Sequence, residues 1–119
     1  MEKEKGRKDK INIPVLFGEC GSVIKSFDVD AYNKDDKTVI EVEAGRAVDN
    51  NQFLKDLFEA CMMHEVDYLI IAVCNNYRYK KKGKYVIDKD YETISKFIET
   101  LYYNNRMSLP IKGLLLIGY

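Results

Sequence analysis

Two short segments in which apolar and polar residues alternate constrain the fold of this chain most strongly. They cover residues 27–32 and 39–44, and a period of two is typical of half-buried β-strands. The five residues between them, Asn-Lys-Asp-Asp-Lys at 33–37, have the composition of a tight turn. We therefore predict a β-hairpin over residues 27–44.

The register of this hairpin follows from placing the apolar side chains of both strands on one face. A turn centred on residues 35–36 satisfies that condition, because side chains alternate strictly across a strand. We expect the apolar face to point into the core. It consists of three opposed pairs: Phe27 with Ala44, Val29 with Val42, and Ala31 with Ile40.

The same register gathers carboxylates on the other face of the hairpin. It sets Asp30 opposite Glu41 and Asp28 opposite Glu43, at about 5 Å between Cβ atoms, where like charges destabilise a pair. A divalent cation would neutralise them, and oxygen ligands favour Mg²⁺, Mn²⁺ or Ca²⁺ over zinc. The sequence therefore predicts a metal site here, and the alternative is a solvated acidic face.

The rest of the chain has alternating helix and strand patterns. Residues 49–51 are predicted to cap a helix that runs to about Glu65, with Lys55, Asp56 and Glu59 facing away from the core. The apolar run at 68–74 predicts a strand buried on both faces. A second helix, capped by Asp88 or Asp90, and a last strand over residues 111–119 complete an α/β domain with a mixed sheet flanked by helices.

The amino-terminal part is predicted to be less regular. Residues 1–10 hold eight charges and are expected to fray, and residues 11–17 to form an edge or irregular strand because of Pro14. The chain as a whole, residues 1–119, has the length of one domain.

Charge is unevenly distributed along the chain although the net charge is zero. Residues 28–67 carry eleven acidic and four basic groups, whereas residues 68–87 carry five basic groups and no acid. Three scattered cysteines indicate a reducing compartment, and no apolar stretch is long enough to cross a bilayer. We therefore expect a cytoplasmic protein without a membrane partner.

The order of these motifs resembles the PD-(D/E)xK nuclease superfamily, whose fold is restriction-endonuclease-like. The resemblance rests on Asp30, the motif Glu41-Val42-Glu43, the helix after it and the buried strand that follows. Glu43 stands where the family usually has lysine, as in restriction enzymes resembling the BamHI and BglII group.

The resemblance implies a metal-dependent endonuclease that hydrolyses the phosphodiester bonds of DNA. Asp30 and Glu41 would hold Mg²⁺ or Mn²⁺ together with the carbonyl oxygen of Val42. Glu43 would orient or deprotonate the attacking water, or bind a second ion. Asp28 would support the ligands or exchange roles with Asp30, and Glu19 is a further supporting candidate.

The basic residues supply candidate contacts to the nucleic-acid backbone. They are Arg46 after the motif and, in the basic run, Arg78, Lys80, Lys81, Lys82 and Lys84. A solvated loop is the alternative for the lysines. Two other functions remain open: a catalytically inactive nuclease-fold module that binds nucleic acid or a protein partner, and a structural or dimer-forming domain. A homodimer would suit a nuclease that cuts two strands.

Overall fold

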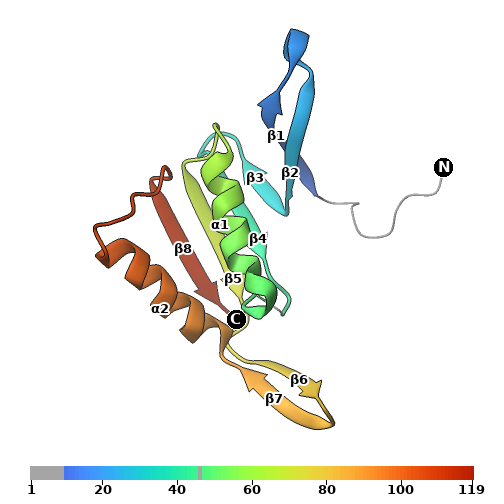
Figure 1. The fold of residues 1–119 in the computed structure, drawn as a ribbon, viewed down its shortest axis with the longest axis vertical. Coiled ribbons are helices and arrows are strands. Elements are labelled where there is room, and N and C mark those ends of the chain that lie inside the picture. The colour runs from blue at the N-terminus through green and yellow to red at the C-terminus, as the bar shows by residue number, and fades with distance from the viewer. Residues whose placement is uncertain (1–9, 46) are drawn as a thin grey trace, which may run out of the picture.

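The computed structural model describes residues 10–45 and 47–119, and these residues form a mixed α/β fold (Figure 1). The α/β class predicted from the sequence is confirmed. Of the residues expected to fray, 1–9 lie outside the described part of the chain. Lys10 is described and precedes the first strand.

A four-stranded sheet forms the centre, with the strand order β3-β4-β5-β8. Its members are β3 (Ala31–Asn33), β4 (Thr38–Val42), β5 (Tyr68–Val73) and β8 (Gly113–Gly118). Strands β4, β5 and β8 are parallel to one another, and β3 is antiparallel to β4. Helix α1 (Gln52–Met62) connects β4 to β5, and helix α2 (Asp90–Tyr103) precedes β8.

The predicted turn and the pairing next to it are confirmed. Ala31 lies opposite Ile40, and the side-chain oxygen of Asn33 accepts hydrogen bonds from the backbone N–H groups of Asp35 at 3.0 Å and Asp36 at 3.2 Å. This local bonding by an asparagine is a common way to close a turn.

The predicted hairpin does not extend further, and its two outer pairs are wrong. The chain bends at Asp30, and β2 (Val23–Val29) pairs instead with β1 (Ile11–Phe17) in a separate sheet. Phe27 lies opposite Ile13, and Val29 opposite Ile11. Strand β1 thus supplies the apolar residues opposite β2, whereas the sequence predicted that residues 42–44 would do so. The irregularity expected at Pro14 is present as a register shift after it.

Both helices of the described chain pack on one face of the central sheet, and that face carries Glu41. Parallel pairing aligns Val39 with Leu69 and Glu41 with Ile71, and all four side chains are buried. The expected core-facing residue Val42 points the other way and is 50% exposed. The prediction that the face without carboxylates forms the core side of β4 is therefore wrong.

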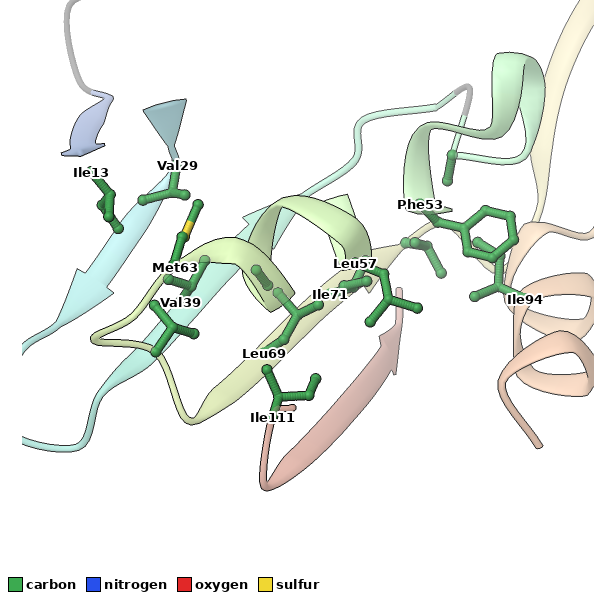
Figure 2. Packing of buried hydrophobic residues seen from close by; sticks show 14 residues of the cluster. Ile13, Val29, Val39, Phe53, Leu57, Met63, Leu69, Ile71, Ile94 and Ile111 are labelled. Atoms are coloured by element: carbon green, nitrogen blue, oxygen red, sulfur yellow. The ribbon is translucent and has the colours of Figure 1, made fainter. Parts of the chain in front are cut away.

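The reason lies in β5, whose side chains decide which face is covered. Leu69, Ile71 and Val73 are completely buried, whereas Tyr68, Ile70 and Ala72 on the other face are not. The strand is thus buried on one face, not on both as predicted. Figure 2 shows this core continuing from Ile13 and Val29 across the sheet to the helices.

The helices differ from expectation at their ends. Helix α1 ends at Met62, earlier than predicted, and its N-cap residue Asn51 makes no side-chain capping bond. Helix α2 begins at Asp90 after Lys89, so neither Asp88 nor Asp90 is its N-cap residue. The rings of Phe53 and Phe97 meet edge to face at 5.4 Å between centroids and join the two helices.

The basic run forms a β-hairpin and not the loop expected from its charge. Strands β6 (Tyr77–Lys81) and β7 (Lys84–Asp88) pair antiparallel and project from the carboxyl end of β5 (Figure 1). Among the described residues, no helix has the length and apolar character needed to span a membrane.

Candidate metal site

A polar cavity of about 550 Å³ lies where β2, β4 and α1 meet. Its walls carry six carboxyl groups and three ammonium groups. The carboxyl groups belong to Asp28, Asp30, Glu41, Glu43, Asp56 and Glu59, and the ammonium groups to Lys10, Lys25 and Lys55. Because the acids outnumber the lysines, the cavity is suited to a cation.

Asp30 occupies the bend between β2 and β3, where Val42 and Lys10 hold its carboxylate. Its Oδ2 accepts a hydrogen bond from the backbone N–H of Val42 at 2.8 Å, and its Oδ1 lies 3.0 Å from Lys10 Nζ. Burial alone would raise the pKa of Asp30, but the hydrogen bonds from Val42 and Lys10 outweigh it and lower the pKa. Asp30 is therefore ionised at neutral pH.

Glu41 shares a hydrogen bond with Asp30 and carries the proton of that pair. Its side chain comes from the covered face of β4, and the residue is only 6% exposed. Burial, and then the negative charge of Asp30, raises the pKa of Glu41 to about 8. The structure thus brings Asp30 and Glu41 together, although they meet through a bend and not through the strand pairing that the sequence predicted.

Glu43 forms a second carboxyl pair with Asp56, a residue that the sequence reading assigned to the solvent-facing side of α1. That assignment is wrong, because Asp56 is 9% exposed. Burial, followed by the hydrogen bond with Glu43, raises the pKa of Asp56 to about 9. Within the described residues, its Oδ2 is buried without a hydrogen-bond partner, which is costly unless a ligand supplies one.

The spacing along α1 contains the signal that would have identified Asp56. Phe53, Leu57 and Ala60 form the buried stripe of this helix. Asp56 is three residues after Phe53 and four before Ala60, so it lies on the same stripe. Glu59 was missed in the same way. Its side chain is 15% exposed, and burial raises its pKa despite Lys55 at 3.9 Å.

The remaining predicted site residues lie at different distances from this cavity. Asp28 lines it and accepts a hydrogen bond from Asn12 Nδ2 at 3.0 Å. Val42 also lines it. Glu19 lies in the turn at the opposite end of the β1–β2 hairpin, away from the cavity. Arg46 lies outside the described residues.

The carboxylate oxygens are suitable ligands for a hard divalent cation, but they do not form a preformed coordination site. Across residues 10–45 and 47–119, no three Asp, Glu, His or Cys side chains are grouped so that they could hold a metal ion. The raised pKa values instead leave Glu41 and Asp56 mostly protonated at neutral pH, and Asp30 forms an ion pair with Lys10. A cation would have to replace these protons and the ion pair with Lys10.

A second cavity, of about 590 Å³, is mostly apolar and lacks such a cluster. It lies between the β1–β2 hairpin and the end of α1, and its lining includes Leu16, Phe27, Met62 and His64. Among the described residues, Asp67 supplies the one carboxylate in its lining. The concentration of acids therefore distinguishes the polar cavity as the candidate site.

Comparison with known proteins adds no assignment to this geometry. No protein-family model matches the chain, and neither a curated protein nor a solved structure shows significant similarity to it.

Proposed function

We propose that this protein is a metal-dependent phosphodiesterase of the restriction-endonuclease-like type, acting on DNA. The observation that carries the proposal is the junction of two acid pairs, Asp30 with Glu41 and Glu43 with Asp56, beside a buried carboxyl oxygen that has no partner within the described chain. Buried acids with raised pKa values in a cavity are typical of functional sites. The order of Asp30, Glu41 and Glu43 along the chain supports the same family.

The proposal gives the residues of the polar cavity separate roles in metal binding and catalysis. Asp30 and Glu41 would hold Mg²⁺ or Mn²⁺, with the Val42 carbonyl as a further oxygen ligand, and Glu43 would orient the attacking water or accept its proton. A bound Mg²⁺ supplies Lewis-acid activation of water and stabilises the charge that develops on the phosphate. Lys10, once released from Asp30, leaves an ammonium group in the same cavity for a phosphate oxygen.

A second candidate is a nucleic-acid-binding module with the same fold and no turnover. The observation in its favour is that protons and Lys10 already satisfy most of the acidic groups. Such a protein would bind DNA and leave it intact.

The test combines calorimetric titration with MgCl₂ or MnCl₂ and cleavage of a supercoiled plasmid. Glu41→Gln is the informative variant, because the amide resembles the protonated carboxyl of the cation-free protein and should leave the fold intact. We expect it to weaken cation binding by about 10- to 100-fold and to abolish nicking. Glu65→Gln is the matched control, since this exposed glutamate only approaches Lys37 at 3.8 Å.

Three outcomes separate the candidates. Cation binding and nicking by the wild type support the nuclease if Glu41→Gln weakens binding and abolishes nicking while Glu65→Gln changes neither. Binding of DNA and cation without nicking supports the module. If the wild-type protein binds no divalent cation, the metal site and the nuclease are both excluded.

A further inference from the structure

The β6–β7 hairpin is the most basic element of the described chain. It carries Arg78 and four lysines, and its one acidic residue, Asp88, is the last residue of β7. All five cationic side chains are exposed. A concentration of positive charge on one projecting element is the electrostatic feature expected of a surface that contacts phosphates.

The two faces of the hairpin are different. Tyr77 and Tyr79 stack at 5.5 Å between ring centroids and are half-buried. The opposite face is exposed: Arg78 lies opposite Ile87, and Lys80 lies opposite Tyr85 with its Nζ 5.0 Å from the centre of that ring. This outer face therefore combines two cations with two apolar groups.

A further positive charge, that of Lys82, lies at the tip of the hairpin, at the end away from its base. Lys82 and Gly83 form the two-residue turn, with φ values of +52° and +76°. Asparagine is favoured over lysine at the first of these positions, because a positive φ is unfavourable for a long side chain. The turn thus retains a lysine at a conformational cost.

The base of the hairpin is attached beside the acidic site. Gly45, two residues after Glu43, packs so closely on the Tyr77 ring that a Cβ atom would overlap it. The Tyr119 hydroxyl donates to the Glu43 carbonyl at 2.6 Å, and the Asn75 N–H donates to the Tyr119 carbonyl at 2.7 Å. The hairpin and Glu43 are therefore connected through a short chain of contacts.

We infer that the β6–β7 hairpin enters the major groove of duplex DNA, with its outer-face cations, Arg78 and Lys80, and its tip lysine beside phosphates. The inference rests on the proposed function for the class of substrate. Two paired strands lie about 5 Å apart, and each five-residue strand is about 17 Å long. The major groove of B-DNA, about 12 Å wide, admits such a ribbon, whereas that of A-form RNA is too narrow.

The test measures binding without cleavage, by fluorescence anisotropy of a labelled DNA duplex in EDTA. The variant Arg78→Gln/Lys80→Gln removes two cations of the outer face. Lys34→Gln/Lys96→Gln is the matched control, because it removes the same charge from exposed positions outside the hairpin. If two phosphate contacts are lost, affinity should fall by at least about tenfold at 0.1 M salt, and the salt dependence, d log K/d log[salt], should weaken by about 1.8.

Lys82→Asn separates binding from folding. Asparagine adopts a positive φ more readily, so this variant should melt at the same temperature as the wild type or higher and yet bind duplex DNA more weakly. Methyl green, which occupies the major groove, should displace the protein, and netropsin, which occupies the minor groove, should not. The inference is overturned if the hairpin variants bind like the control, or if duplex RNA of the same sequence binds equally well.

These results are independent of the outcome for the acidic site. Glu65→Gln, the exposed control variant outside the acidic site, should bind duplex DNA as the wild type does. If nicking is never observed but the hairpin variants lose binding, the nuclease fails and the hairpin inference stands. If the wild type nicks DNA and the hairpin variants bind normally, the hairpin inference fails and the nuclease stands.

Discussion

Glu41 is a carboxyl group placed among core residues. It lies on the same face of β4 as Val39 and pairs along the sheet with Ile71. An ionised carboxylate in that position would lose most of its hydration, which explains why the proton is retained and shared with Asp30. Without a bound cation, Glu41 and Asp56 are therefore both mostly protonated at neutral pH. Glu41 is a proposed cation ligand, and Asp56 lines the same cavity.

These protons make the stability of the cation-free protein depend on pH. The pKa of Glu41 is raised from 4.5 to about 8 and that of Asp56 from 3.8 to about 9, so between these values the folded state binds protons that the unfolded state has released. The free energy of unfolding should therefore fall as pH rises from about 5 to 8, by at most about 1.4 kcal/mol per pH unit for each group. Urea denaturation in EDTA at a series of pH values measures this slope.

Two neutral variants identify the groups responsible. Glu41→Gln and Asp56→Asn should each flatten the profile in that range, because the amide cannot be forced to ionise. A profile as steep in both variants as in the wild type would contradict the assignment of the protons to Glu41 and Asp56.

At the scale of elements, α1 and the β6–β7 hairpin are both tied to the end of β4. Helix α1 supplies Phe53 and Leu57 to the core and Asp56 to the cavity from one stripe. The hairpin is held at its base by the contact of Tyr77 with Gly45. The segment after Glu43 thus positions a core helix on one side and a basic ribbon on the other.

Gly45→Ala tests this attachment. Gly45 has a φ of +113°, and an added Cβ would overlap the Tyr77 ring, so we expect a loss of at least about 2 kcal/mol in the free energy of unfolding. Gly21→Ala is the control, because Gly21 has a φ of +74° and open space around it. It should lose only about 1 kcal/mol. Equal losses in thermal or urea denaturation would show that the contact with Tyr77 contributes nothing.

At the scale of the whole molecule, the central sheet is covered on one face by the elements that the structure describes. Leu69 is completely buried beneath the helices, whereas Leu115, from the adjacent strand β8, is 54% exposed on the other face. This face is mainly apolar, and it includes Val42, Ile70 and Ile117.

A comparison of two identical substitutions tests which face carries the core. Leu69→Ala should lower the free energy of unfolding by about 3 kcal/mol, because it leaves a cavity in packed surroundings. Leu115→Ala should cost less than about 1 kcal/mol. Urea denaturation of both variants measures the difference, and similar losses would mean that the outer face is also packed in solution.

Local patterns in the sequence were sufficient for several features. The turn at residues 33–37, the pairing of Ala31 with Ile40, the irregular strand at Pro14 and the α/β class all depend on neighbours close in the chain or on element order. The basic hairpin was missed because its charge hid the alternation of Tyr77 with Tyr79 and of Tyr85 with Ile87. Its Lys-Gly turn was available as a signal.

The remaining features of the fold depend on contacts between segments far apart in the sequence. The sequence by itself determined that Asp30 and Glu41 lie close together, because the short turn pairs Ala31 with Ile40 next to them. Only the tertiary structure decided that β1 replaces the end of β4 as the partner of β2, and that the helices cover the acidic face of β4. That choice followed from burial of Leu69, Ile71 and Val73, which gains more than desolvation of one protonated glutamic acid costs. It also brought Asp56 from α1 to Glu43, a contact that strand periodicity alone does not encode.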